Sequence, residues 1–341
     1  MYKVIYDDRQ SGHDPLYLVT NGKFVKSREH PDRAANMLKA CSEAGFEIRK
    51  AKQFDRKHIH AVHSERYVKF LETAFDEWAK IPGSGAEVIP NVFPVADEAI
   101  CPTSTVGRAG FHISDLAAPI GAGTWQAALG AAEAALTAAE CILEGDKTAY
   151  ALCRPPGHHA FSERASGYCF LNNAAIAANY LTNDNSKVAL LDVDVHHGNG
   201  SQDIFYSRDD VFFASIHADP NTTYPFFWGY PEQNGKGKGE GYTANVPLPI
   251  GTNDEQFILG LNSLLQKIDD FKPDRLVISL GLDTFGGDPY KLFNLTTGCY
   301  RRMSKEIAKL GIATVIIQEG GYLCDQLGDN LTEFLTGIID Q

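Results

Sequence analysis

The chain has 341 residues, of which 44% are hydrophobic and 22% charged, and this balance excludes disordered, collagen-like and coiled-coil proteins. Its formal net charge of −12 disfavours nucleic acid as a partner. The seven cysteines are odd in number, widely spaced and form no CxxC pair, so we expect free thiols in a cytoplasmic protein.

The chain opens with MYKVIYDDRQSGHD, which has no apolar segment of the signal-peptide kind and is predicted to form a short strand. The most apolar helical pattern, AALGAAEAALTAAECIL, is interrupted by Glu133 and Glu140. A membrane span needs about 20 consecutive apolar residues, so we expect a soluble helix here and no membrane contact.

Two helical patterns, at residues 65–80 and 126–144, flank a stretch rich in glycine and proline at residues 82–123. This stretch has no sustained period. Loops of such length are rare in compact domains and are usually functional or part of an interface. We therefore expect a long excursion from a single domain that spans residues 1–341.

Five apolar runs of strand length follow one another along the chain, at residues 149–153, 188–195, 211–216, 276–280 and 313–317. They are nearly continuous rather than alternating, as is typical of strands buried on both faces of a parallel sheet. Helical patterns separate most of them, at residues 171–181, 254–271 and 299–310. This alternation predicts a doubly wound α/β fold.

Each apolar run ends in polar, reactive side chains. Cys153 is followed by RPPGHHA, Leu191 by DVDVHHGNG, Ile216 by His217-Ala-Asp219, Leu280 by GLDTFGGD and Ile317 by QEGGY. Ligands of open α/β sheets bind outside the carboxyl ends of the strands, so we expect these loops to meet at one site.

Asp194 and His196 are two residues apart, which would place them on the same side of a strand, and Asp283 follows another strand. Two carboxylates and one imidazole suit Zn²⁺ or Fe²⁺ with an open coordination position. Alternatively, the aspartates cap helices and His196 is a packed core histidine. That alternative is favoured for any one residue alone, but not for all three beside a histidine pair.

The pair His158-His159 follows Pro-Pro-Gly on a restricted turn and could supply ligands or a general acid and base. Asp192 and Asn199 are candidates to orient these rings. Tyr322, after Glu319-Gly-Gly, could donate a hydrogen bond to an oxyanion, although an isolated tyrosine is more often a half-buried packing residue. We expect His197 and His217 to be structural neighbours of the site. Six other histidines are assigned no role: His13, His30, His58, His60, His63 and His112.

Six segments, in this order, resemble the zinc-dependent histone deacetylase superfamily: RPPGHHA, GYCFLNNAA, LDVDVHHGNGSQDIFY, FFASIH, SLGLDTFGGDP and EGGY. HPDRA, at residues 30–34, extends the resemblance. The long excursion and the total length most resemble bacterial acetylpolyamine amidohydrolases. The resemblance implies an arginase-like α/β fold in which an eight-stranded parallel sheet is flanked by helices.

The resemblance also implies roles for individual residues. Zn²⁺, or Fe²⁺ in the cell, would bind Asp194, His196 and Asp283. His158 and His159 would flank the attacking water, with His159 as the general base and then the general acid, and Tyr322 would polarise the acetyl carbonyl. One K⁺ site would use Asp192, Ser215 and the backbone of Asp194, His196 and Ile216, and a second the backbone near Phe205, Arg208, Val211 and Tyr242. Tyr168 and Tyr224 would line the substrate tunnel.

Three positions depart from the family pattern. Asn199 stands where some deacetylases have an aspartate, and a neutral partner makes His159 less basic. The glutamates that receive a distal ammonium in a known amidohydrolase have no counterpart, because the aligned residues are Val106 and Ala117. The excursion does carry other acids: Glu87, Asp97, Glu98 and Asp115.

The function that we expect is hydrolysis of small cationic N-acetylated polyamines, in a homodimer, at a long, narrow site with an acidic mouth. One alternative is removal of acetyl groups from lysines of proteins. Another is a non-catalytic protein that binds acetyl amides or polyamines, which the filled catalytic positions disfavour. A phosphatase is disfavoured because no glycine-rich phosphate loop or basic cluster accompanies the site.

Overall fold

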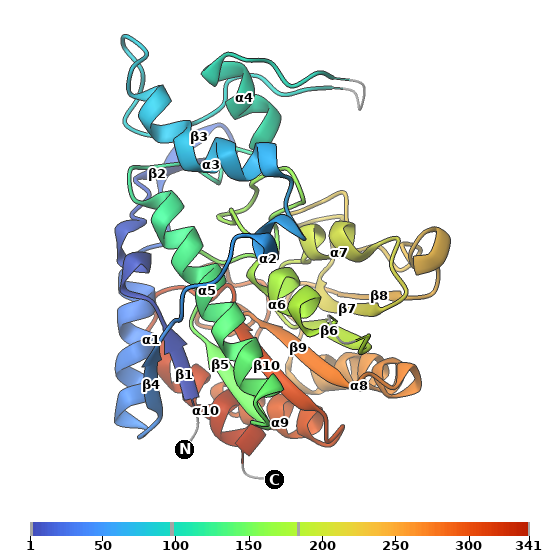
Figure 1. The fold of residues 1–341 in the computed structure, drawn as a ribbon. Helices are drawn as coiled ribbons and strands as arrows, with labels where there is room; N and C mark the ends of the chain where they lie inside the picture. The colour runs from blue at the N-terminus through green and yellow to red at the C-terminus, as the bar shows by residue number, and fades with distance from the viewer. Residues whose placement is uncertain (1–2, 96–98, 183–184, 340–341) are drawn as a thin grey trace.

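The computed structural model describes residues 3–95, 99–182 and 185–339. At its centre lies an eight-stranded sheet in which every neighbouring pair of strands is parallel (Figure 1). The strand order across the sheet is β4 (Glu47–Lys50), β1 (Lys3–Tyr6), β5 (Thr148–Ala151), β10 (Ala313–Gln318), β9 (Arg275–Leu280), β6 (Val188–Asp192), β7 (Val211–Ala218) and β8 (Thr243–Leu248). The single α/β domain with an eight-stranded parallel sheet is thus confirmed.

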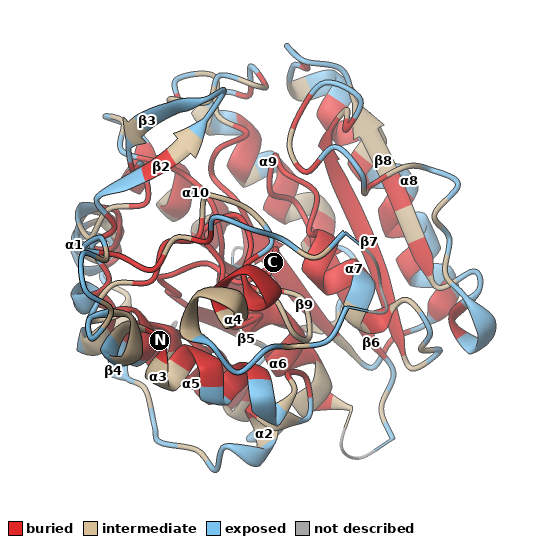
Figure 2. Ribbon diagram, turned by 90° about the horizontal axis from the view of Figure 1, so that it is seen from above, coloured by how far each residue is buried: buried red, intermediate tan, exposed pale blue. Residues whose placement is uncertain are grey.

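Helices cover both faces of the sheet. One face packs against α5 (Thr124–Leu143), α6 (Asn173–Leu181) and α7 (Asn199–Phe205), and α2 (Lys57–His60) and α3 (Glu65–Trp78) extend the same apolar core. The helices on the other side are α1 (Asp32–Glu43), α8 (Asp254–Phe271), α9 (Thr297–Ala308) and α10 (Leu327–Ile339). Successive strand residues enter opposite layers, as the pleat requires: Leu190 of β6 joins the first core and Leu191 the second. Figure 2 shows the resulting buried strands between partly exposed helices. Among the described residues, every helix is too short or too polar to cross a membrane.

The predicted elements agree with the structure for the buried strands and the long helices, and differ at the edges of the sheet. The helix at residues 254–271 has the predicted bounds. The strands β4 and β8 were not predicted, because an edge strand is only partly buried and lacks a continuous apolar run: EIRK in β4 is mostly exposed. The strand expected at residues 188–195 ends at Asp192.

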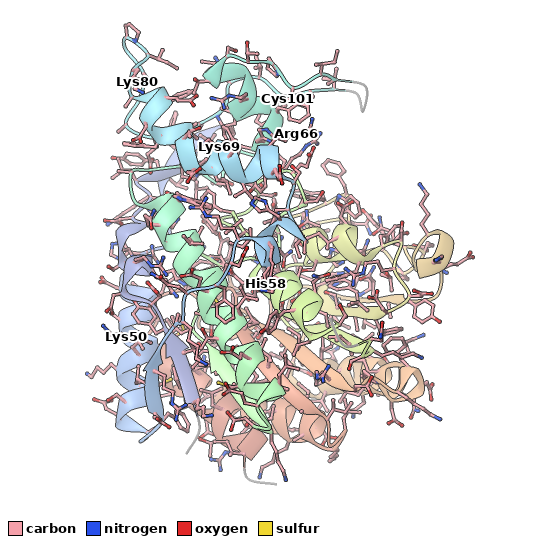
Figure 3. The ribbon with its side chains drawn as sticks, in the orientation of Figure 1. Lys50, His58, Arg66, Lys69, Lys80 and Cys101 are labelled. Atoms are coloured by element: carbon pink, nitrogen blue, oxygen red, sulfur yellow. The ribbon has the colours of Figure 1, made fainter. Side chains whose placement is uncertain are left out.

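The sequence suggested that the excursion at residues 82–123 is a loop without regular structure, but this segment is partly ordered into secondary structure. It contains the helix α4 (Thr105–His112), and its two ends are joined by a bridge between Val88 and Ile120. The eight-residue helix was missed because two glycines interrupt its pattern. Figure 3 labels Arg66, Lys69 and Lys80 along and just beyond α3, at the same end of the molecule as Cys101 of the excursion.

A small antiparallel hairpin lies at that same end of the molecule (Figure 1). Its strands are β2 (Tyr17–Thr20) and β3 (Lys23–Lys26). The N–H of Val19 donates to the carbonyl of Leu116 at 3.2 Å, which joins the hairpin to the excursion. Two short 3₁₀ helices, Asp8–Gly12 and Gly237–Gly239, complete the elements of the described chain.

Candidate active site

The loops after β6 and β9 bring together Asp194, His196 and Asp283. One potential ligand atom from each lies within 4.8 Å of the others, and all three side chains are buried. Nδ1 of His196 lies 3.3 Å from Oδ1 of Asp194 and 3.2 Å from Oδ2 of Asp283. Asp194 and His196 are not brought together by the strand alternation that we expected, because β6 ends before Asp194. Instead the loop folds back, so that the N–H of His196 donates to Oδ1 of Asp194 at 2.9 Å.

These three side chains fit a divalent cation. Oδ2 of Asp283 is buried and accepts no hydrogen bond from the described residues. Burial and the neighbouring Asp194 raise the pKa of Asp283, whereas His158 and His196 outweigh burial and lower the pKa of Asp194. Two buried carboxylates that share a single imidazole are costly, and a bound cation would compensate their charge. Two carboxylates and one imidazole form an open donor set for Zn²⁺ or Fe²⁺.

The EGGY segment after β10 must approach these carboxylates closely. The N–H of Gly320 donates to Oδ2 of Asp194 at 2.7 Å. A β-carbon on Gly320 would lie 2.3 Å from Oδ2 of Asp283 and 2.5 Å from Oδ2 of Asp194. Only glycine therefore fits at this position without displacing one of the carboxylates.

The histidine pair lies beside the cluster, with a different partner for each ring. Nδ1 of His158 is 3.0 Å from Oδ2 of Asp192, and Nδ1 of His159 is 2.7 Å from Oδ1 of Asn199. The two ring centres are 3.9 Å apart. This geometry places Asp192, the buried carboxylate on β6, directly against a histidine.

The partners make the two rings different bases. Burial alone would lower the pKa of His158, but Asp192, Asp194 and Glu319 raise it to about 10. Burial lowers the pKa of His159, and the neighbouring His158 and His196 lower it further. His158 thus lies in an ion pair with Asp192, whereas His159 is neutral and able to accept a proton.

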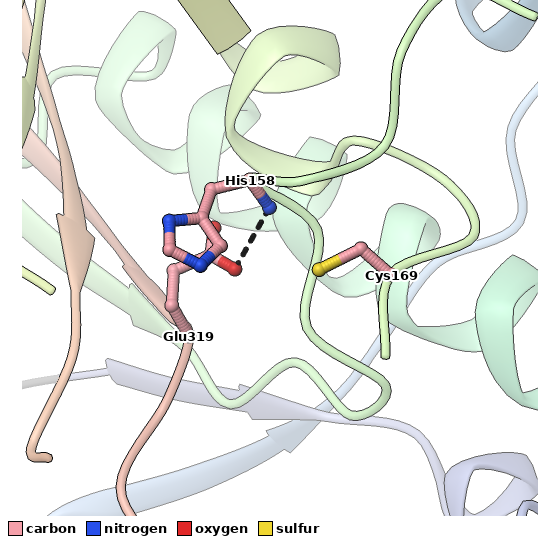
Figure 4. Close-up of side chains that lie close together, drawn as sticks. All are labelled: His158, Cys169 and Glu319. Atoms are coloured by element: carbon pink, nitrogen blue, oxygen red, sulfur yellow. Dashed lines mark hydrogen bonds between the residues drawn. The ribbon is translucent and has the colours of Figure 1, made fainter. Parts of the chain in front are cut away.

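Beneath the pair, Glu319 holds the backbone of the histidine turn (Figure 4). Its Oε2 accepts hydrogen bonds from the N–H groups of Gly157 at 2.6 Å and His158 at 3.1 Å. Cys169 also lies nearby, and His158, Cys169 and Glu319 form a second group at metal-ligand spacing. Burial raises the pKa of the Cys169 thiol well above its usual value, and Sγ donates to the carbonyl of Gly167. We therefore assign this second group to support of the histidine turn.

Three predicted tyrosines surround the cluster. The ring of Tyr224 lies 4.9 Å from that of His159 and 6.2 Å from that of His196. The rings of Tyr168 and Tyr322 are 6.0 Å apart. Burial raises the pKa of Tyr322 well above 10, so its phenol remains a hydrogen-bond donor at neutral pH.

The residues predicted for monovalent cations lie in two groups. Asp192 of β6 is directly opposite Ser215 of β7, and Ile216 follows it. The Oγ of Ser215 lies 2.9 Å from Nδ1 of His217, and the ring of His217 is 4.6 Å from that of His197. The second group lies where α7 leads into β7 and where β8 begins: Phe205, Arg208, Val211 and Tyr242.

Comparison with known proteins identifies the family of the chain. The family model described as histone deacetylase domain matches residues 27–338. The chain belongs to the histone deacetylase family. It is therefore a deacetylase-type amidohydrolase enzyme, in a family that is zinc-dependent.

Within this family, the chain is 41% identical to acetylpolyamine amidohydrolase 2 of Pseudomonas aeruginosa, over 98% of both sequences. Histone deacetylase 8 of Arabidopsis thaliana is 38% identical, but the match covers 64% of this chain and 60% of that protein. The crystal structure of an acetylpolyamine aminohydrolase from Burkholderia pseudomallei has a TM-score of 0.96 and 39% identity, over 100% of this chain and 99% of the other.

The two described acids of the excursion, Glu87 and Asp115, both accept hydrogen bonds from neighbouring segments of this deacetylase-family chain. Glu87 is buried and accepts from the N–H of Leu16 at 2.9 Å. Oδ2 of Asp115 accepts from Ser166 Oγ, Tyr224 Oη and the N–H of Gly167, at 2.8–2.9 Å. Asp97 and Glu98 lie outside the described residues. Val106 lies in α4, and Ala117 packs against the tyrosines of the site.

Sequence reasoning missed two contributors to the site, Leu18 and Tyr290, although the segment GLDTFGGD included Asp288. Leu18 of the hairpin packs against Tyr168 and Tyr322. Asp288 and Tyr290 lie at the end of the segment GLDTFGGDPY, and the ring of Tyr290 is 5.1 Å from that of His196. The available signal for Tyr290 was its position directly after the GGDP segment.

Proposed function

We propose that the protein removes acetyl groups from N-acetylated polyamines and releases polyamine and acetate. The observation that carries this proposal is the histidine pair beside the Asp194–His196–Asp283 cluster, with His158 against the carboxylate of Asp192 and His159 against the amide of Asn199. This arrangement suits amide hydrolysis. Acetylpolyamine amidohydrolases match the chain over nearly its whole length, which favours an acetylated amine over a protein substrate.

The metal would bind Asp194, His196 and Asp283, and Fe²⁺ would accept the same ligands as Zn²⁺. A bound ion would polarise the acetyl carbonyl and acidify a water molecule. His159 would take the proton from that water and return it to the departing amine, because Asn199 orients its ring through Nδ1 and leaves Nε2 free to accept a proton. His158, paired with Asp192, would hold positive charge near the developing oxyanion, and Tyr322 would donate a hydrogen bond to it. Tyr168 and Tyr224 would line the path of the acyl chain.

We also propose that K⁺ stabilises the loops around β6 and β7. The support is the direct opposition of Asp192 and Ser215 on these strands, with Ile216 next to them.

All seven cysteines of the described chain are free, which supports a reducing, cytoplasmic setting.

A homodimer is the assembly that we propose. The excursion exposes several apolar side chains, among them Val92, Val95 and Ile100, and Phe227 at the edge of the site is 81% exposed. Exposed apolar patches of this kind mark interaction surfaces. Light scattering coupled to size-exclusion chromatography would test it, with Val95→Asp and Ile100→Asp expected to yield monomers.

The decisive experiment compares kcat/KM of the zinc-loaded protein on acetylputrescine, acetylcadaverine, acetylspermidine and an acetyl-lysine peptide. Higher values for the free acetylated amines would support the proposal. Higher values for the peptide would favour the protein deacetylase, and binding without turnover of any substrate would favour a binding protein.

A further inference from the structure

We propose that Glu29 is a positioning residue for amide hydrolysis, which holds Tyr322 in place relative to the histidine pair through two buried arginines, Arg33 and Arg154. This inference rests on the roles that the proposed function gives to Tyr322 and to the histidines, and it deepens them because it names what fixes their relative position. Glu29 directly precedes the segment HPDRA and lies outside the catalytic cluster. Its effect on the reaction therefore passes through the arginines that it binds.

The carboxylate of Glu29 joins two arginines from distant segments of the chain. Nη1 of Arg33 donates to Oε1 of Glu29 at 2.8 Å, and Nη2 of Arg154 donates to Oε2 at 2.9 Å. The exposed fraction of each of the three residues is 1% or less. Burial alone would raise the pKa of Glu29, but Arg154 and Arg33 outweigh burial and lower it, so the carboxylate is ionised. Hydrogen bonds between ionised partners are strong when water is excluded.

Arg33 connects this carboxylate to the segment that carries Tyr322. Its Nε donates to the carbonyl of Gly321 at 2.5 Å and its Nη2 to the carbonyl of Glu319 at 2.7 Å, while Nη1 binds Glu29. A planar guanidinium whose three nitrogens bind three separate acceptors has one orientation. Its central carbon lies 4.7 Å from the centre of the Tyr322 ring. Arg33 thus contacts both the backbone that precedes the tyrosine and the ring itself.

Arg154 connects the same carboxylate to the histidine pair. It is the first residue of RPPGHHA, the segment that carries both rings. Its Nη1 donates to the carbonyl of Gln10 at 2.6 Å, and its Nη2 donates to the carbonyl of His13 as well as to Glu29. Arg154 is therefore fixed by acceptors on the N-terminal segment. Glu29 is the carboxylate that the arginines of both catalytic segments share.

The reaction needs this precision. A donor to an oxyanion has to lie about 2.7–3.1 Å from the oxygen, and a displacement of about 1 Å can cost about 100-fold in rate. Arg33 and Arg154 carry like charges, so they would move apart without a carboxylate between them. The carbonyls bound to Arg33 would then shift, and Tyr322 with them.

Glu29→Asp tests this inference, because it keeps the charge but shortens the side chain by one methylene, so that one carboxylate no longer reaches both arginines. We expect kcat on acetylputrescine to fall about tenfold or more, with KM within about threefold and zinc content unchanged. The same substitution in Tyr322→Phe separates positioning from general damage. Since the phenol is then absent, Glu29→Asp should lower kcat in that background by less than about threefold.

Glu133→Asp is the matched control. Glu133 lies on α5, is also buried and forms an ion pair with Arg9. Its shortening should lower Tm, but it should leave kcat within about threefold of the parent protein in both backgrounds.

Equal fold losses from Glu29→Asp in the two backgrounds, or wild-type kcat in Glu29→Asp, would overturn the inference. If Glu29→Asp does not fold, Arg33→Lys replaces it, because lysine keeps the charge beside Glu29 but lacks the fork that binds three acceptors. The same dependence on Tyr322 is expected, and equal losses would again overturn the inference. A wild type that hydrolyses only the acetyl-lysine peptide would reject the polyamine function, whereas the four kcat values measured on that peptide would still decide the role of Glu29.

Discussion

Oδ1 of Asn199, the first residue of α7, lies 2.7 Å from Nδ1 of His159. Burial and the neighbouring His158 and His196 lower the pKa of His159, and the hydrogen bond with the neutral amide of Asn199 raises it too little to offset them. The other histidine of the pair faces the carboxylate of Asp192 instead. Two adjacent rings of one turn thus differ in charge because their partners differ.

This relationship predicts the effect of Asn199→Asp on the pH profile. A carboxylate beside Nδ1 stabilises the imidazolium and raises the pKa of His159, so the ring remains protonated to higher pH and cannot act as a base. We expect the acidic limb of kcat/KM to move to higher pH, with zinc content unchanged. A profile with the same acidic limb as the wild type would exclude His159 as the titrating base.

Tyr322→Phe should lower kcat about 10²–10³-fold and leave metal content intact, because it removes one hydrogen-bond donor to the oxyanion. Steady-state kinetics with acetylputrescine measure the loss. Tyr300→Phe is the matched control: it removes another buried phenol, which lies 2.8 Å from Thr284 Oγ and donates to the carbonyl of Leu282. That variant should be less stable but retain kcat. Near-normal turnover in Tyr322→Phe would remove the oxyanion role.

Zinc should stabilise the folded chain. Binding compensates the buried charge of Asp194 and Asp283, and a ligand present at 1,000 times its Kd contributes about 4 kcal/mol to the free energy of unfolding. We expect Zn²⁺ to raise the Tm of the chelator-treated protein and to have little effect on Asp283→Asn. Asp274→Asn is the control, because Asp274 accepts from the N–H of Lys187 far from the cluster. An equal rise in Tm for Asp283→Asn would reject the proposed ligand set.

Glu319 should act as a positioning residue for the histidine turn. Glu319→Ala removes the acceptor for two backbone N–H groups, and the loss of an outer support of this kind lowers activity about 10–100-fold. We expect a fall in kcat with KM nearly unchanged. Glu319→Gln keeps an acceptor oxygen and should recover most of the activity. If alanine and glutamine behave alike, the carboxylate rather than the hydrogen-bonded geometry matters.

His63 should contribute to acid sensitivity. Its Nδ1 lies 3.0 Å from the carbonyl of Phe161 and its Nε2 accepts from the N–H of Asn172 at 2.9 Å, so both nitrogens are used by the neutral ring. Burial lowers its pKa to about 4 from 6.5. The unfolded chain therefore gains a proton as the pH falls below 6.5, whereas the folded chain does so only near 4.

The free energy of unfolding should decrease through that window, and this residue accounts for about 3 kcal/mol of the decrease. His63→Gln, measured by urea unfolding at pH 7, 6, 5 and 4, should show a smaller decrease than the wild type. An identical pH dependence in the two proteins would contradict the assignment.

The sequence by itself determined the layers of the fold and most of the chemistry. Apolar runs marked the buried strands because both faces of a parallel sheet are covered, and reactive residues at their ends marked the site. It could not determine the edge strands, whose residues are half exposed, nor the order of the strands. In the sheet β9 lies between β10 and β6, although β7 and β8 separate β6 from β9 along the chain. This order brings Gly320 and Asp283 to Asp194.

The tertiary structure also decided which polar side chains remain available to bind a substrate. Asp115 and Glu87 looked like receptors for an ammonium group, but hydrogen bonds to neighbouring loops occupy them. Tyr290 and Leu18 looked like ordinary residues and lie against the catalytic groups. A side chain's partners depend on loops that meet only after folding, because contacts between distant segments leave no periodic signal in the sequence. Residue type therefore indicated the reaction, and packing decided which partner each side chain has.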